Sequence, residues 1–157
     1  MFVIREDDLS NRQTRDLLAL HLSGMHKNSP PDAVFALDLG GLQAPDVTVW
    51  SAWQTVGYGQ LEIASIGALK MLGDGMAEVK SMRTYPDYLR QGAAAAILDT
   101  IIAAARERGV RRLSLETGRG EAFEPALAMY RKRGFVDGDA FADYRPNAFS
   151  QFLHLDL

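Results

Sequence analysis

The stretch from Glu78 to Gly109 constrains the fold more than any other part of the chain, because it joins a strand, a glycine turn and a long helix. Residues 77–84 alternate in the manner of a strand. Apolar residues then recur every three or four positions from Ala94 to Ala105, which is the period of a helix with one apolar face. Gly109 stands where such a helix ends.

The alternation also assigns the side chains of this strand to two faces. Even-numbered positions are expected on one face and odd-numbered positions on the other: Glu78, Lys80, Met82 and Thr84 against Val79, Ser81 and Arg83. Glu78 would then share a face with Met82 and Thr84.

The turn between strand and helix has the small residues that a phosphate site needs. Unpaired N–H groups at a helix N-terminus attract an anion, and small side chains let the anion reach the backbone. We therefore expect a phosphate to bind along the turn, at Arg90, Gln91, Gly92, Ala93, Ala94 and Ala95. The alternative is an ordinary alanine-rich first turn, since alanine is the best helix former.

Length and composition favour one folded domain over residues 1–157. The chain has 157 residues, of which 47% are hydrophobic and 24% charged, as in globular proteins. Its net charge of −3 argues against nucleic acid as a partner. The absence of cysteine excludes thiolate chemistry and disulfides, and His21 and His26 are spaced wrongly for a shared metal, so no metal is expected.

The N-terminus and the hydropathy pattern argue against targeting to a membrane. The acidic run Glu6-Asp7-Asp8 follows the first residues directly, so no signal peptide is expected. No run of eighteen apolar residues is present. We expect a cytoplasmic protein.

The remaining pattern predicts a mixed α/β fold. Ser10 and Gln13 form a capping-box pattern that would start a helix with His21 turned inward. Residues 110–117 read as a strand that returns parallel to 77–84 by a right-handed crossover. The other expected elements are strands at 2–5, 47–53, 63–70, 135–136 and 150–155, a short helix from Pro31 to Gly40-Gly41, and a helix at 126–133.

Taken in order, these segments resemble the GNAT superfamily of acetyl-CoA-dependent N-acetyltransferases. The resemblance covers nearly the whole chain and is carried by residues 77–80, 90–94, 113–118 and 128–135. The segments at 80–83, 113–118 and 141–144 are similar to a subgroup of small, largely uncharacterised bacterial members. The resemblance implies an α+β fold with a mixed, mostly antiparallel sheet flanked by helices, whose parallel strands splay at the coenzyme site.

The same resemblance implies how acetyl-CoA would be held. The family's pyrophosphate loop has the form Arg/Gln-x-x-Gly-x-Gly/Ala, and its last four positions match residues 91–94. Leu89 departs from the pattern at the first position, where neighbouring Arg90 can replace the lost side-chain contact. Met82 and Thr84 occupy the strand positions whose backbone groups contact pantetheine and thioester in the family.

Two residues take catalytic roles by resemblance. Glu78 matches a carboxylate that accepts the amine proton directly or through water, and its alternative is a solvated residue at a strand end. Tyr130 matches the tyrosine that protonates the leaving thiolate, and its alternative is an aromatic residue covering the sheet.

The amine acceptor is the least defined feature, and the sequence leaves monomer and homodimer open. The expected acceptor is a small molecule, amino acid or peptide with a primary amine. Candidate contacts are His21, Met25, Pro30, Phe35, Ser114, Glu116, Tyr144 and Ser150. A second hypothesis is a catalytically idle acyl-CoA-binding module, which the departure at Leu89 favours.

Overall fold

A single seven-stranded sheet forms the centre of the computed structural model, which describes residues 1–157. The strand order is β1-β2-β3-β4-β5-β7-β6, and every neighbouring pair is antiparallel except β4 and β5. The strands are β1 (Val3–Glu6), β2 (Val47–Val56), β3 (Gln60–Gly73), β4 (Met76–Thr84), β5 (Arg112–Thr117), β6 (Val136–Asp137) and β7 (Gln151–Asp156). The expected mixed, mostly antiparallel sheet is confirmed.

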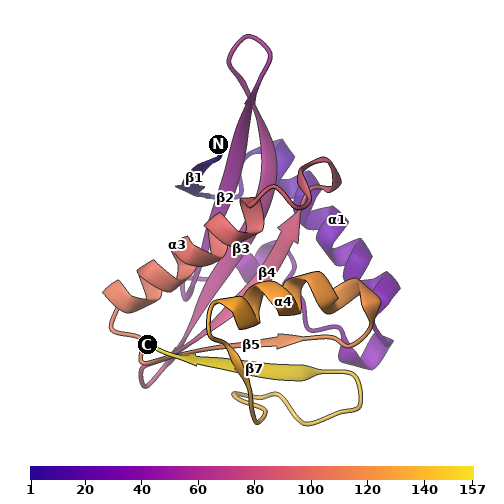
Figure 1. The fold of residues 1–157 in the computed structure, drawn as a ribbon, viewed down its shortest axis with the longest axis vertical. Helices are drawn as coiled ribbons and strands as arrows, with labels where there is room; N and C mark the ends of the chain where they lie inside the picture. Colours follow the sequence, from indigo (N-terminus) through magenta and orange to yellow (C-terminus); the bar gives the residue numbers. More distant parts are fainter.

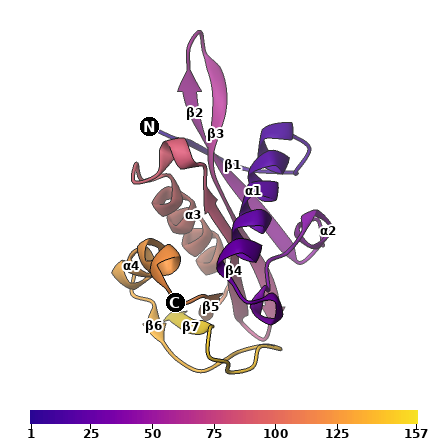
Figure 2. The same cartoon turned by 90° about the vertical axis from the view of Figure 1, so that its right-hand side faces the viewer.

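Helices cover both faces of this sheet. The α-helices are α1 (Arg12–Asn28), α2 (Leu39–Leu42), α3 (Ala93–Glu107) and α4 (Glu124–Lys132), and short 3₁₀ turns span Pro31–Ala33, Pro86–Tyr88 and Glu121–Phe123. Figure 2 shows α3 and α4 on one side of the sheet and α1 and α2 on the other. None of these helices has the length and hydropathy that crossing a membrane requires.

The apolar faces of the helices build two cores. On one face of the sheet, Ile97, Leu98 and Ile101 of α3 are completely buried, in agreement with the predicted helical period. On the other face, Leu17 and Leu18 of α1 pack against β2 and β3. Burial of each such side chain contributes roughly 1.5–3 kcal/mol, so these stripes fix which face each helix covers.

The central crossover forms as predicted, and it ends early. β4 and β5 pair in parallel over only three positions, from Met76 with Arg112 to Glu78 with Ser114. Beyond Glu78 the two strands diverge, which Figure 1 shows as β5 turning away from the direction of β4. The expected splay is therefore present, and β4 continues past it with one edge unpaired.

A β-bulge at Ser81 overturns the predicted division of faces in β4. Lys80 pairs with Ala68 of β3 and Arg83 pairs with Ile66, so two residues of β4 oppose the single residue Gly67. Ser81 takes a positive φ of 58°, and the extra residue shifts the alternation by one. Arg83 therefore joins Glu78 and Lys80 on the α1 face, while Met82 turns toward α3.

Two N-terminal details also differ from expectation. Asn11, not Ser10, caps α1 by accepting a hydrogen bond from the Gln13 N–H, because the Ser10 hydroxyl and N–H both bind Asp8. Gln13 instead uses its side chain to bind the backbone of β3 at residues 61 and 63.

The expected helix from Pro31 to Gly40-Gly41 is also wrong. Residues 34–38 are not helical, and the two glycines lie inside α2, where Asp38 accepts a hydrogen bond from the Gly41 N–H. Tertiary contacts hold this segment in place: the Phe35 carbonyl accepts a hydrogen bond from Lys80, and the Phe35 ring packs edge-on against Tyr144.

Candidate active site

The turn before α3 presents a row of free backbone donors. None of the N–H groups from Arg90 to Ala95 donates a hydrogen bond within the chain, and no side chain caps the helix. The first four N–H groups of any helix lack helical partners, and here the preceding turn extends the row. Such a row at the positive end of a helix can hold a phosphate.

Backbone conformation explains why this turn needs small residues. Gly92 has a φ of 88°, which glycine adopts without the steric cost that other residues bear, and a Cβ there would meet no atom within 4 Å. The space beside Gly92 is thus open. Leu89 is 57% exposed and the Gln91 side chain binds back to the Asp87 carbonyl, so neither side chain covers the row.

The stretch of β4 beyond Glu78 forms the second part of the site. This segment pairs with β3 on one side only, so its other edge offers free backbone groups next to the divergence from β5. Met82 and Thr84 lie on this segment, and Thr84 Oγ1 lies 3.1 Å from Ser65 Oγ. The Ser81 hydroxyl in the bulge is buried and has no hydrogen-bond partner.

Glu78 is the centre of a buried polar cluster. Its side chain is only 4% exposed, and its Oε2 accepts hydrogen bonds from Tyr144 Oη at 2.5 Å and from Lys80 Nζ at 3.2 Å. Lys80 Nζ also donates to Tyr144 Oη at 2.8 Å. Burial and the Glu78 carboxylate raise the pKa of Tyr144. The alternative of a solvated Glu78 is wrong.

A second carboxylate lies in the same neighbourhood on β5. Glu116 Oε2 accepts a hydrogen bond of 2.7 Å from Ser150 Oγ, and Glu116 interacts electrostatically with Glu78 and Lys80. Burial raises the pKa of Glu116, which makes its carboxylate a stronger base than an exposed one.

Tyr130 is buried on α4 with a free hydroxyl. Its ring packs edge-on against Phe135, with the centroids 5.8 Å apart, and no group of the chain hydrogen-bonds its hydroxyl. Burial, and next the Glu116 carboxylate, raise the pKa of Tyr130 above the ordinary value of 10.0. Tyr130 is therefore protonated at neutral pH, and its proton is available only to a strong base nearby.

The other predicted contacts divide into two groups. Phe35, Glu116, Tyr144 and Ser150 lie in or against the polar cluster around Glu78. Ser114 does not, because it is fully buried and its Oγ bonds His154 Nδ1 at 2.7 Å. His154 Nε2 donates a hydrogen bond of 2.8 Å to the Asp139 carbonyl, because a carbonyl oxygen can only accept.

His21 is buried, as predicted, and it contacts Arg83, which the strand pattern had placed on the face opposite to Glu78. Its Nδ1 accepts a hydrogen bond of 3.0 Å from Arg83 Nε. Burial, Arg83 and Lys80 together lower the pKa of His21 from 6.5 to about 3. Met25, one turn further along α1, is half-buried, and Pro30 is exposed. Neither Lys80 nor Arg83 was predicted as a site residue.

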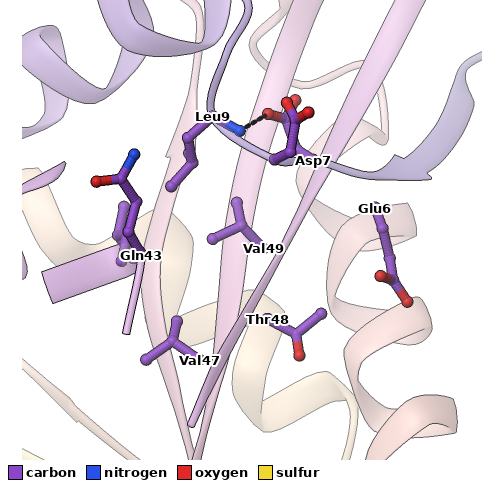
Figure 3. A pocket seen from close by; sticks show the side chains of 9 residues that line it. Glu6, Asp7, Leu9, Gln43, Val47, Thr48 and Val49 are labelled. Carbon is purple, nitrogen blue, oxygen red and sulfur yellow. Dashed lines mark hydrogen bonds between the residues drawn. The ribbon is translucent and has the colours of Figure 1, made fainter. Parts of the chain in front are cut away.

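Two hollows lie away from the β4 edge. The first, about 270 Å³, lies between the end of β1, α2 and the start of β2, and none of the predicted site residues lines it (Figure 3). Asp7 there accepts hydrogen bonds from the Leu9 N–H, Thr14 and Ser51, so it stabilises the fold. The second, about 590 Å³, has Tyr144 and Ser150 in its wall and thus adjoins the polar cluster.

Comparison with known proteins identifies the family. Residues 14–135 match the model of the Acetyltransferase (GNAT) family. The chain belongs to this family. It is 47% identical to the uncharacterised N-acetyltransferase YedL of Escherichia coli over 157 residues, which cover 100% of this chain and 96% of YedL. Membership of this family supports acyl transfer from an acyl-CoA.

Solved structures share the GNAT fold. A Klebsiella pneumoniae protein assigned as an acyl-CoA N-acyltransferase superposes with a TM-score of 0.82 at 26% identity, covering 100% of this chain and 98% of that one. A Bacillus subtilis acetyltransferase in complex with CoA superposes with a TM-score of 0.69 at 19% identity, covering 100% and 99%. The second likeness shows the fold alone.

The lowered pKa of His21 predicts a specific loss of stability in acid. Between its unfolded value of 6.5 and about 3, the unfolded chain binds a proton that the folded chain refuses. Stability should therefore fall as pH falls, with a contribution from His21 of up to about 1.4 kcal/mol per pH unit. Urea unfolding from about pH 7 to about pH 4 should show a shallower dependence for His21→Gln.

His26 supplies the matched control, because it is exposed on the same helix and its side chain makes no hydrogen bond. His26→Gln should keep the pH dependence of the parent protein. An unchanged slope in His21→Gln would show that His21 is protonated in the folded state.

Proposed function

We propose that this GNAT protein transfers the acetyl group of acetyl-CoA to the primary amine of a small molecule, amino acid or peptide. The observation that carries the proposal is the row of free N–H groups at the start of α3, which one short 3₁₀ turn separates from the strand that diverges from β5. The CoA complex of the Bacillus subtilis neighbour supports the same ligand here.

The residues of this chain fit the parts of acetyl-CoA. The N–H groups from Arg90 to Ala95 would hold the pyrophosphate. Arg90 belongs to the same turn, so its guanidinium would add a charged contact to the pyrophosphate. The free edge of β4 at Met82 and Thr84 would align the pantetheine by backbone hydrogen bonds. Bound in this way, acetyl-CoA supplies a thioester whose carbonyl the amine attacks.

Acetyl transfer requires two proton movements that the chain must provide. The attacking amine must lose a proton, and the departing thiolate must gain one. Glu78 is the proposed base, because its carboxylate is buried beside the divergence of the strands and is connected through Tyr144 toward a hollow. Tyr130 is the proposed acid, because its hydroxyl is protonated and free of partners.

Glu116 is a second candidate for the base. Burial raises the pKa of Glu116 above that of an exposed carboxyl, which is the direction that favours a general base, and Glu116 lies near both Tyr130 and Glu78. Glu78, by contrast, already accepts bonds from Lys80 and Tyr144.

The idle acyl-CoA-binding module is the competing function. Leu89 is exposed and forms no part of the donor row, so the departure at this position leaves the backbone cradle intact. A thiol-release assay with acetyl-CoA and a panel of amines, amino acids and polyamines separates the two functions. Release of CoA that depends on an added amine supports the enzyme, and binding of acetyl-CoA without turnover supports the idle module.

Adding a carboxylate to the donor row should block coenzyme binding without harming the fold. Ala94 lies in the first turn of α3, where a negative charge stabilises a helix by about 0.3–1 kcal/mol. Ala94→Glu should therefore keep its thermal stability and lose affinity for acetyl-CoA by at least about tenfold, because the carboxylate repels the pyrophosphate. Calorimetric titration measures this loss.

Ala94→Gln is the matched control, since glutamine has the same size and no charge. It should bind acetyl-CoA more tightly than Ala94→Glu does. Equal affinity of the parent protein and Ala94→Glu would place the coenzyme elsewhere.

Removing the Tyr130 hydroxyl should slow the chemical step. Tyr130→Phe keeps the packing against Phe135 and removes a hydroxyl that makes no hydrogen bond, so stability and acetyl-CoA affinity should change little. Turnover should fall by about 10²- to 10⁴-fold. Steady-state kinetics measure this loss. Tyr58→Phe is the control, because Tyr58 is exposed at the tip of the β2–β3 hairpin and should leave turnover unchanged. Full turnover with lowered thermal stability would leave Tyr130 a packing residue only.

The two carboxylates should differ in their pH–rate profiles. If Glu78 accepts the amine proton, Glu78→Gln should lower kcat/KM most at low pH, where few amines are neutral, and the loss should shrink as pH rises. Glutamine can still accept the bonds from Tyr144 and Lys80, so the cluster stays connected. A profile of Glu78→Gln parallel to that of the parent, with a pH-dependent loss in Glu116→Gln, would transfer the role to Glu116.

A further inference from the structure

Arg83 is a partly buried cation without a counter-charge. Its guanidinium has no carboxylate within 4.0 Å, and its only hydrogen bonds run from Nε to His21 Nδ1 at 3.0 Å and from Nη2 to the His21 carbonyl at 3.5 Å. Nη1 has no partner at all. Burial lowers the pKa of Arg83, as expected for a charge removed from water without compensation.

The surroundings hold this guanidinium in one orientation. Gly24 of α1 leaves the space for it, because a Cβ at that position would lie 2.9 Å from Nη2 and 3.2 Å from Nη1. His21, one turn earlier on α1, fixes Nε while remaining neutral. The unused donors are therefore preorganised, which is the condition under which arginine binds a carboxylate with two parallel hydrogen bonds.

The bulge at Ser81 places Arg83 beside the proposed catalytic groups. It moves Arg83 onto the face that carries Glu78 and Lys80, at the next position along that face after Lys80. Same-face neighbours on a strand lie about 7 Å apart. Lys80 is paired with Glu78, so of the two cations on this face of β4 only Arg83 keeps unused donors.

We propose that Arg83 binds the carboxylate of the acceptor, so that the acceptor is an amino acid with a free carboxylate rather than a simple amine or polyamine. This inference rests on the proposed acetyl transfer, since it assigns the second anchor of that same acceptor. An amino acid bound in this way directs its amine toward the polar cluster around Glu78, and its carboxylate supplies the counter-charge that Arg83 lacks.

The test compares α-amino acids with their α-carboxamides, which keep the amine and lose the carboxylate charge. CoA-saturated protein is titrated with both ligands by calorimetry, and kcat/KM is then measured for both with acetyl-CoA. The parent protein should bind the amino acid selectively. Arg83→Gln should lower affinity and kcat/KM for the amino acid by at least about tenfold and change those for the carboxamide by less than about twofold.

An amino acid and its carboxamide differ in the basicity of their amines. Comparing the parent protein with each variant, separately for each ligand, removes this difference. Arg83→Lys keeps the charge without the planar fork and should retain part of the selectivity, which also serves if Arg83→Gln is unstable. Arg12→Gln is the charge-matched control, because Arg12 is exposed on α1 and pairs only with Asp16. It should leave both ligands unaffected.

The binding measurement tests the carboxylate site, and the turnover measurement tests the proposed function. Equal affinity of the parent for acid and carboxamide, or equal losses for both in Arg83→Gln, would overturn the carboxylate site even with active enzyme. Selective, Arg83-dependent binding without acetyl transfer would support the carboxylate site and overturn the proposed function.

Discussion

The short parallel pairing between β4 and β5 is the constraint on which the site depends. It ends after Glu78 and Ser114, and the bulge at Ser81 follows three residues later on β4. A bulge bends its strand and increases the twist, so β4 continues away from β5 with a free edge. After β4, the short 3₁₀ turn Pro86–Tyr88 leads the chain to the turn before α3. The free edge of β4 and the free N–H donors of α3 are thus both consequences of one backbone path.

The same path determines which charges are buried together. Glu78 and Lys80 lie on the α1 face of β4, where Tyr144 from the C-terminal segment completes their hydrogen bonds. Burying such ions costs several kcal/mol each unless they are paired, and replacing a pair with apolar groups often stabilises a protein. Packing alone therefore does not require this cluster. Its position beside the diverging strands agrees with the proposed proton transfer.

Much of the fold follows from local patterns. The period of α3, the stop at Gly109 and the presence of strands β2 and β3 depend on neighbouring residues and were predicted correctly. The faces of β4 were predicted incorrectly beyond Lys80, because Ser81 is an ordinary strand residue in sequence and nothing local marks its positive φ. The segment at 34–38 was predicted as helix for a similar reason: its conformation depends on contacts of Phe35 with Lys80 and Tyr144.

Short motifs in the sequence were enough to predict the family, the donor row and the aromatic residue on α4, since such motifs encode a glycine turn, a helix start and a helix stop. The three-dimensional fold was needed to show that Tyr144 bonds Glu78, that the Ser114 hydroxyl is hydrogen-bonded to His154, and that Arg83 faces α1 without a counter-charge. These contacts join residues 40 to 66 positions apart. Hydrogen bonding and charge burial act through distance in space, which a local pattern does not contain.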